Sequence, residues 1–284
     1  MREDLLSVPG SAERVEIHGY SGAGGRTLRY RVVRARVQRH ALLYLHGIES
    51  HGDWFLAAAH ALAGHGCTTY LVDRRGSGLN RELGPGDARS ARVLLEDVRC
   101  FRAHVDPGPV VLVGLSWGGK LAVAAALDQM EGVRALVLIT PGLVPLVDLS
   151  RGQKLLLALS LVLGGRARFR VPIAPEMFTR VPRTLHFIQA DPLRLTRVTG
   201  RFLLASRALD RTIQARVREL DRPVLLFLAG HDRIVDNERT RSLLERSAPG
   251  RLRVRIYEHA THSIQLDDTE DLVSDICPFL EEVA

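Results

Sequence analysis

The residues best suited to chemistry stand at Gly114-Leu115-Ser116-Trp117-Gly118, a G-x-S-x-G pattern. Residues 110–113 before it are apolar and mostly β-branched, which predicts a buried strand. Residues 120–127 after it are rich in Ala and Leu, which predicts a helix. A serine in a tight turn between a strand and a helix exposes its hydroxyl and can act as a nucleophile. Gly114 and Gly118 fit this turn, because a Cβ at either position would collide with the neighbouring strand or helix.

A serine hydroxyl is a weak nucleophile until a neighbouring base takes its proton, and the base must be oriented by an acid. Residues 224–228 and 252–257 predict two strands. The first is followed by Asp232 and the second by His262. The carboxyl ends of parallel strands meet at one edge of a sheet, so we expect Asp232 and His262 beside Ser116.

Two other residues compete for the roles of acid and base. Asp236 lies four residues after Asp232, and its alternative role is to cap the helix that follows. His259 lies closer to its strand than His262, and its alternative role is to brace the loop. We therefore assign Ser116 as nucleophile, Asp232 as acid and His262 as base.

A serine nucleophile also needs two backbone N–H groups that stabilise the developing oxyanion. We expect one from Trp117, at the start of a helix whose partial positive charge favours an anion. The other is expected from Ile48 in His46-Gly47-Ile48, which follows a predicted strand at 41–45. His46 itself is interpreted as a structural residue of this turn. No His, Cys or Asp cluster has the spacing of metal ligands, so no metal is expected.

Strand and helix patterns alternate along the chain, which predicts an α/β fold with a mostly parallel, eight-stranded sheet and helices on both faces. Asp53 is expected to cap the first of these helices. The strands are predicted at residues 13–20, 27–35, 41–45, 67–72, 110–113, 135–140, 223–228 and 252–257. The helices are predicted at 55–62, 88–105, 120–127, 200–220, 237–247 and from 270 onward.

The alternation stops between residues 143 and 200, where several prolines occur. We expect residues 1–142 and 201–284 to form the core, and 143–200 to form a mostly helical cap over Ser116. The run from Leu155 to Leu163 is apolar almost all round. It is therefore a candidate substrate-binding segment, with three possible places: buried in the core, lining a tunnel for an acyl chain, or touching lipid. Basic residues on both sides of the run favour contact with an anionic lipid surface.

The chain resembles the α/β-hydrolase superfamily, and within it the branch of monoacylglycerol lipases and lysophospholipases. In that branch the motif after the third strand is H-G-x-G-E-H, in which the glutamate stands one position later than Glu49. The resemblance depends on His46-Gly47-Ile48-Glu49-Ser50-His51, Asp73-Arg74-Arg75-Gly76-Ser77-Gly78, Gly114-Leu115-Ser116-Trp117-Gly118-Gly119, Gly230-His231-Asp232 with Ile234-Val235-Asp236, and His259 to His262.

The resemblance implies an α/β-hydrolase fold with a cap. It places the nucleophile, acid and base on Ser116, Asp232 and His262, and the oxyanion amides on Ile48 and Trp117. It also implies cleavage of carboxylic esters of acylglycerols or lysophospholipids without a cofactor.

The net charge of +7 is unevenly distributed. Residues 141–222 hold 15 basic and 6 acidic residues, whereas the rest of the chain holds 24 basic and 26 acidic residues. No nucleic-acid-binding motif or interleaved aromatic residues accompany the arginines, so a nucleic-acid partner is not expected. The basic excess coincides with the predicted cap, which again favours contact with anionic lipid.

The location of the protein in the cell is predicted from targeting signals and from its cysteines. The start of the chain has no long apolar segment, so we expect no signal peptide. The longest strongly apolar run has nine residues, too few to cross a bilayer. The three cysteines, Cys67, Cys100 and Cys277, are widely spaced and predict neither a disulfide framework nor a zinc site. A cytoplasmic location is therefore expected.

The candidate triad of Ser116, Asp232 and His262 predicts a serine hydrolase that cleaves carboxylic esters. A thioesterase, an amidase or an acyltransferase would use the same three residues, and these alternatives stay open. A hydrolase-fold protein that binds ligands without turnover would be expected to lack part of the triad. Ser116 excludes a haloalkane dehalogenase or an epoxide hydrolase, because both need a carboxylate at this position.

Overall fold

The computed structural model describes residues 15–105, 107–247 and 250–284. Residues 13 and 14 of the first predicted strand, and the N-terminal residues on which the signal-peptide prediction depends, lie outside this part.

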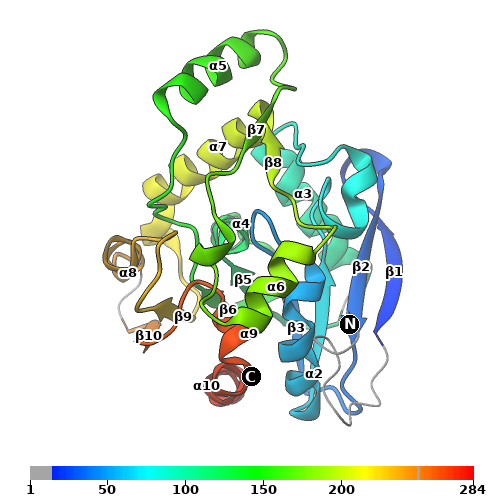
Figure 1. The fold of residues 1–284 in the computed structure, drawn as a ribbon. Helices are drawn as coiled ribbons and strands as arrows, with labels where there is room; N and C mark the ends of the chain where they lie inside the picture. The colour runs from blue at the N-terminus through cyan, green and yellow to red at the C-terminus, as the bar shows by residue number, and fades with distance from the viewer. Residues whose placement is uncertain (1–14, 106, 248–249) are drawn as a thin grey trace.

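An eight-stranded sheet runs through the centre of the molecule (Figure 1). Its order is β1-β2-β4-β3-β5-β6-β9-β10, where β2 is antiparallel to both its neighbours and all other pairs are parallel. The mostly parallel sheet predicted from the sequence is confirmed. The strands are β1 Glu16–Ser21, β2 Thr27–Val33, β3 His40–Leu45, β4 Cys67–Val72, β5 Val110–Leu115, β6 Val133–Ile139, β9 Val224–Ala229 and β10 Leu252–Tyr257.

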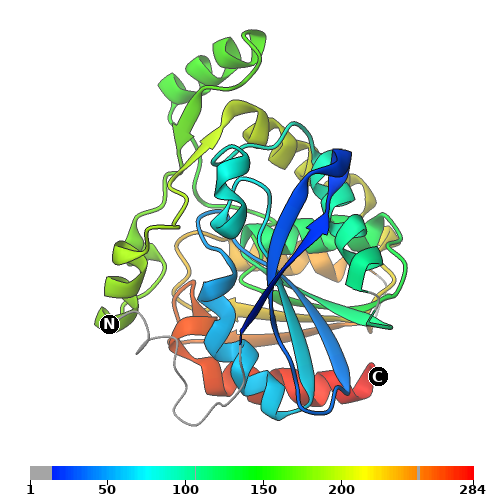
Figure 2. The same ribbon diagram turned by 90° about the vertical axis from the view of Figure 1, so that its right-hand side faces the viewer.

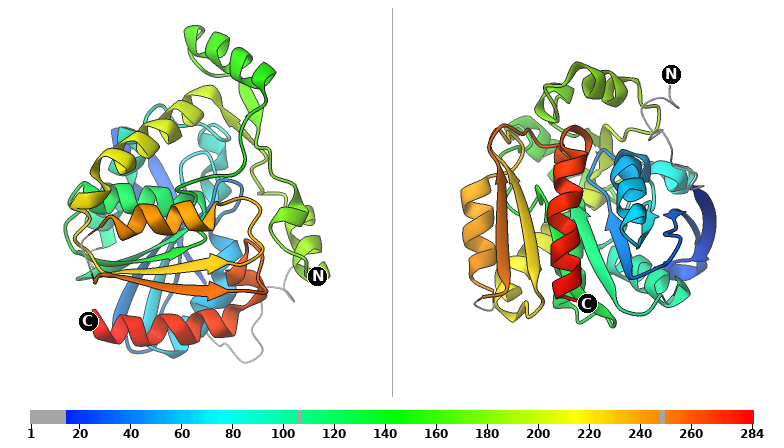
Figure 3. Two further views of the ribbon diagram at one scale, coloured as in Figure 1. Left: turned by 90° about the vertical axis from the view of Figure 1, so that its left-hand side faces the viewer. Right: turned by 90° about the horizontal axis from the view of Figure 1, so that it is seen from below.

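Helices cover both faces of this sheet, as Figure 3 shows from the side and from below. The apolar side chains of α2 (Leu56–Gly64) and α10 (Thr269–Glu282) belong to the core on one face. The core on the other face contains side chains of α3 (Ala91–Val105), α4 (Trp117–Leu127), α7 (Gly200–Arg216) and α8 (Asn237–Glu245). The inner strands β3, β5 and β9 are buried along their whole length and mostly apolar, rather than alternating, because helices cover both of their faces.

Two local predictions were wrong. The helix expected from residue 88 begins at Ala91. Asp53 does not cap a helix, because it lies inside the first turn of a 3₁₀ helix, Gly52–Phe55, whose N-cap is His51. The Asp53 carboxylate instead lies 2.5 Å from the buried guanidinium of Arg31, which requires a counter-charge there.

The segment 143–200 contains less helix than expected. Its helices are α5 (Arg151–Val162) and α6 (Pro182–Ala190), with one 3₁₀ turn, Pro175–Met177. Strand β7 (Arg168–Arg170), between the two helices, pairs antiparallel with β8 (Arg197–Thr199), which follows α6. The sequence did not predict this ribbon. Strands of three residues are too short to show an alternating pattern.

Helix α5 stands away from the rest of the molecule in both Figure 1 and Figure 2. Ser150 and Gln153 form a capping box at its start. Its apolar run is not buried: Leu155 is 74% exposed and Val162 is 84% exposed. The interpretation of this run as part of the core is therefore wrong. Nowhere in the described ranges is a helix long and apolar enough to cross a membrane.

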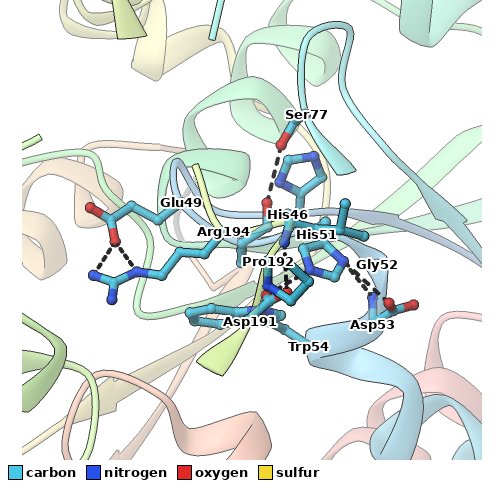
Figure 4. A network of polar contacts seen from close by, with 12 residues as sticks. His46, Glu49, His51, Gly52, Asp53, Trp54, Ser77, Asp191, Pro192 and Arg194 are labelled. Carbon is cyan, nitrogen blue, oxygen red and sulfur yellow. Dashed lines mark hydrogen bonds and ion pairs between the residues drawn. The ribbon is translucent and has the colours of Figure 1, made fainter. Parts of the chain in front are cut away.

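The segment 143–200 is held to the core by a buried polar network around Asp191 (Figure 4). One Asp191 oxygen lies 2.8 Å from Nε2 of His51 and accepts a 2.7 Å hydrogen bond from the indole of Trp54. Burial alone raises the pKa of Asp191, but the hydrogen bonds from His51 and Trp54 outweigh it and lower the pKa to about 2. Folding therefore favours the ionised carboxylate.

Replacing Asp191 by Asn should lower the free energy of unfolding by about 2 kcal/mol at pH 7, since each pKa unit corresponds to about 1.4 kcal/mol. A carboxylate whose pKa is lowered by folding contributes its full stabilisation of the folded protein above the pKa that it has in the unfolded chain. This contribution is lost as the pH falls through the folded-state pKa of about 2. The difference between wild type and variant, measured by urea unfolding, should thus shrink to about half by pH 3. Asp148→Asn, at an exposed ion pair with Lys154, is the control and should change stability by less than about 1 kcal/mol. An equal effect of both changes would contradict the anchoring role.

Candidate active site

Ser116 occupies a strained turn at the carboxyl end of β5. Its φ of 50° and ψ of −121° lie outside the regions that non-glycine residues favour. The turn requires close approach of the strand and the helix, because a Cβ on Gly114 would lie 2.5 Å from Cα of Gly119. A Cβ on Gly118 would collide with the carbonyl of Leu45 on β3. The predicted strand–turn–helix geometry around Ser116 is therefore present.

Asp232 and His262 meet at the same edge of the sheet, from the loops after β9 and β10. Nδ1 of His262 lies 2.8 Å from Oδ2 of Asp232, and both side chains are almost fully buried. The backbone N–H groups of Ile234 and Val235 donate to the other Asp232 oxygen, at 2.8 and 3.0 Å, and fix the carboxylate. Because a carboxylate only accepts, Nδ1 of His262 carries the proton and Nε2 is free to act as a base.

Ser116 and His262 line one small cavity of about 10 Å³. Nε2 of His262 is buried and has no hydrogen-bond partner among the residues that the structure describes. The hydroxyl of Thr140 donates to the His262 carbonyl at 3.0 Å and holds this loop against the end of β6. The structure thus brings together the three residues that the sequence nominated.

The competing residues have other partners. Asp236 is the N-cap of α8, where its side chain accepts a 2.9 Å hydrogen bond from the backbone of Arg239. His259 is exposed, and its Nε2 lies 2.9 Å from Asp268. Both residues therefore have structural partners, in agreement with the non-catalytic roles considered for them from the sequence.

The segment that carries Ile48 is fixed by a buried arginine. Nη1 and Nη2 of Arg74 donate to the carbonyls of Gly47 and Ile48, at 3.2 and 3.0 Å. His46 accepts a 2.9 Å hydrogen bond from the backbone N–H of Arg74. Burial, and then the charge of Arg74, lower the pKa of His46 to about 3, so the ring is neutral. His46 is therefore a structural residue of this turn, as expected.

Arg74 also approaches the second expected oxyanion donor. Its guanidinium carbon lies 4.8 Å from the ring centroid of Trp117 and 5.0 Å from that of Phe202. Burial lowers the pKa of Arg74 to about 9. Arg74 therefore connects the segment of Ile48 with the start of α4. The sequence showed Arg74 only as part of a turn, because carbonyl groups distant in the chain leave no spacing pattern.

A larger cavity, of about 320 Å³, begins at Ser116, Ile48 and Trp117. Most of its lining residues come from segment 143–200 and from α7, and most of the side chains are apolar. Within the predicted substrate-binding run, Leu157 and Leu161 line this cavity, whereas the rest of that run does not. Further lining residues from the two elements are Phe169, Val171, Ile173, Leu203 and Leu204.

One buried ion pair forms part of this larger cavity and was not anticipated from the sequence. Nζ of Lys120 lies 2.6 Å from Asp210 of α7 and 3.1 Å from the hydroxyl of Ser206. Ser206 also accepts a 3.0 Å hydrogen bond from the indole of Trp117. Burial lowers the pKa of Lys120, while Asp210 opposes this effect. The pair joins α4 to α7 beside Ser116.

A protein-family model described as serine aminopeptidase, S33, matches residues 37–269. The chain belongs to this family of α/β hydrolases. The matched residues include Ser116, Asp232 and His262. In the described parts of the chain, no group of three or more His, Cys, Asp or Glu residues could hold a metal ion.

Solved structures of several hydrolases share the fold of this family member. The monoacylglycerol lipase of Paleococcus ferrophilus is 19% identical, with a TM-score of 0.77 over 95% of this chain and 100% of that chain. A soluble variant of monoglyceride lipase from Saccharomyces cerevisiae is 15% identical, with a TM-score of 0.80 over 98% of both chains. A carboxyl esterase from Bacillus coagulans is 14% identical, with a TM-score of 0.79 over 95% of this chain and 98% of that chain.

Among curated proteins, N-formylmaleamate deformylase of Pseudomonas putida is 32% identical over 121 residues. The match covers 41% of this chain and 44% of that protein, less than half the length of the relative.

The assignment of Asp232 as the acid can be tested against Asp236 on the same loop. Asp232→Asn should slow the reaction of Ser116 with a fluorophosphonate by about 10³-fold or more, because the amide no longer holds the required tautomer of His262. Asp236→Asn should change this rate by less than about tenfold and leave stability nearly unchanged, because asparagine caps a helix about as well as aspartate. The measurement is the second-order labelling rate, with folding checked by circular dichroism. The reverse order of the two variants would contradict the assignment.

Proposed function

We propose that this hydrolase cleaves carboxylic esters that carry an acyl chain, with Ser116, His262 and Asp232 as its catalytic residues. The observation that carries the proposal is the position of Ser116. It lines both the small cavity that contains the free Nε2 of His262 and the large apolar cavity of about 320 Å³. An acyl chain in the large cavity would place its carbonyl beside Ser116.

In the proposed reaction, Oγ of Ser116 attacks the ester carbonyl while Nε2 of His262 takes its proton. Asp232 holds the imidazole and stabilises its charged form. The N–H groups of Ile48 and Trp117 bind the oxyanion. The tetrahedral intermediate collapses, His262 protonates the leaving alcohol, and an acyl-enzyme remains at Ser116. Water then releases the carboxylic acid.

An amide substrate is the second candidate, because the curated relative from Pseudomonas putida is named a deformylase of N-formylmaleamate. A thioester substrate or an alcohol acceptor would use the same groups. The volume and apolar lining of the large cavity favour a substrate that carries an acyl chain, whichever bond is cleaved.

Activity should follow the length of the acyl chain. Medium-chain p-nitrophenyl esters should have at least a tenfold higher kcat/KM than the acetyl ester, since each buried CH₂ contributes about 0.8 kcal/mol. Ser116→Ala should lower kcat by at least about 10³-fold without loss of the fold. The series is measured beside matched thioester and anilide substrates. A preference for acetyl esters would contradict the acyl site, and a higher kcat/KM for the anilide would favour the amidase.

We further propose that segment 143–200 is a cap over Ser116 that brings the enzyme to anionic lipid. The large cavity lies between this segment and the core. Helix α5 turns Leu157 and Leu161 toward the cavity and exposes its other apolar side chains. Exposed apolar residues beside basic ones are typical of helices that lie in a membrane interface. The exposed apolar residues are Leu155, Leu156, Leu159, Val162 and Leu163, and the basic residues near them are Arg151, Lys154, Arg166 and Arg168.

Binding to vesicles that contain phosphatidylglycerol should exceed binding to neutral phosphatidylcholine vesicles, and it should fall as salt is added. The double change Leu159→Ser and Val162→Ser should reduce this binding at least tenfold, because it removes apolar area from the exposed face of α5. Val37→Ser is the control, since Val37 is 72% exposed but lies outside the segment. The measurement is sedimentation with sucrose-loaded vesicles. Equal binding to both vesicle types, or an equal loss in the control, would contradict the interface.

A further inference from the structure

The small cavity beside Ser116 differs in character from the large one. We call it the polar cavity and define it by Ser116, His262, Glu49, Ser50 and Gln265, which line it together with neighbouring apolar and backbone groups. Glu49 directly follows Ile48 in the chain, and Gln265 comes three residues after His262. The segments that carry the proposed oxyanion donor and base therefore also supply polar groups to this cavity.

Several of these polar groups have no hydrogen-bond partner within the described ranges. They are Oε1 of Glu49, Oγ of Ser50, Nε2 of His262, and both Oε1 and Nε2 of Gln265. Glu49 and Gln265 are each only 1% exposed. Buried polar groups in folded proteins are normally hydrogen-bonded, to protein or to an ordered water. Donors and acceptors from three segments thus converge on one cavity and require a polar occupant.

The carboxylate of Glu49 is held so that one oxygen remains available. Both Nε and Nη2 of Arg194 contact Oε2 of Glu49, at 2.7 and 2.6 Å. In Figure 4 the two dashed lines from Arg194 end on this one oxygen, and the other oxygen points away from the guanidinium. The backbone of Leu195 also donates to the Glu49 carbonyl at 2.9 Å. Glu49 is therefore fixed from both ends, and Oε1 is left to bind a ligand.

Burial raises the pKa of Glu49 to about 7, although the charge of Arg194 opposes this effect. A carboxylate in this position would gain from any additional donor at Oε1, because that donor would stabilise its charge.

The size of the polar cavity limits its occupant. Its volume of about 10 Å³ is close to what a single water needs, and a buried water makes two to four hydrogen bonds. An alcohol of more than one or two heavy atoms would not fit, whereas the larger cavity of about 320 Å³ can hold the organic part of a substrate.

We propose that Glu49 and Gln265 position the water that hydrolyses the acyl-enzyme. This inference rests on the proposed function, because it needs an acyl group on Ser116 and a base at His262. Oε1 of Glu49 accepts one hydrogen of the water, and the amide of Gln265 donates to its oxygen. The second hydrogen points to Nε2 of His262. Glu49 and Gln265 are positioning residues that act through this water.

The deacylation step then needs no reactant other than this water. The water oxygen forms a bond to the acyl carbonyl carbon, and its proton moves to Nε2 of His262. The tetrahedral intermediate collapses, the bond between the carbonyl carbon and Oγ of Ser116 breaks, and Oγ takes the proton from His262. The carboxylic acid leaves and Ser116 is restored.

The decisive experiment measures the lifetime of the acyl-enzyme in Gln265→Leu. The enzyme is mixed with a p-nitrophenyl ester, and the burst of p-nitrophenolate and the decay of acylated protein are followed by stopped flow and intact mass spectrometry. We expect a burst rate within about threefold of wild type and an acyl-enzyme lifetime at least tenfold longer. Accordingly, kcat should fall while kcat/KM stays nearly constant, since kcat/KM reports acylation when deacylation is slow. Glu49→Gln, a nearly isosteric second variant, should also prolong the lifetime.

Gln189→Leu is the matched control, because Gln189 is an exposed glutamine of α6 outside both cavities. It should leave both rates unchanged. An unchanged acyl-enzyme lifetime in Gln265→Leu, or an equal loss of burst rate and deacylation rate, would overturn the water site while Ser116 remains the nucleophile. Failure of wild-type Ser116 to form any acyl-enzyme would overturn the proposed function itself, and the water site with it.

Discussion

The close contact between β5 and α4 is the constraint on which the rest of the site depends. Ser116 can take its positive φ only because Gly114, Gly118 and Gly119 let the strand, the helix and the neighbouring β3 come together without side chains between them. The strain at Ser116 is balanced by its surroundings: its carbonyl accepts hydrogen bonds from the backbone N–H groups of Gly119 and Gly142, at 2.9 and 2.7 Å. The turn that carries Ser116 is thereby held in place before any substrate arrives.

Ser116 lies between two cavities of different character. On one side lies a large apolar cavity between the core and segment 143–200, and on the other lies the small polar cavity with His262, Glu49 and Gln265. In the proposed mechanism the first binds the acyl chain and the second holds water. The division explains how one serine could serve an apolar substrate and a polar co-substrate in turn.

Segment 143–200 is firmly anchored to the core, but its helix α5 is unusually exposed to solvent. Asp191 and Arg194 attach it to the core beside His51, Trp54 and Glu49 through buried, charge-assisted hydrogen bonds. Helix α5, by contrast, leaves leucines in solvent. Exposed apolar area of this kind is a cost for a monomer in water, and contact with a lipid surface would remove it. The anchor keeps the cavity next to Ser116 while α5 remains available for such contact.

The sequence alone determined the sheet, the order of its elements and the three residues at its carboxyl edge. Apolar strands buried on both sides and helices between them leave strong local patterns. Ser116 follows β5 directly, and Asp232 and His262 lie in the loops after β9 and β10. The sequence could not decide where the run from Leu155 to Leu163 lies, because an all-round apolar helix has the same pattern in a core, a tunnel or a membrane interface. It also did not reveal the β7–β8 ribbon.

Only the tertiary structure showed the contacts of Arg74, Asp191 and Arg194 and brought Glu49 and Gln265 to one cavity. Each acts through contacts with groups far away in the chain: Asp191 lies 140 residues from His51, and Arg194 lies 145 residues from Glu49. Burial and hydrogen-bond partners arise when distant segments pack together, so no local pattern of residue types contains them. The sequence determined which side chains stand at the ends of the strands, and the packing of the chain decided which of them meet.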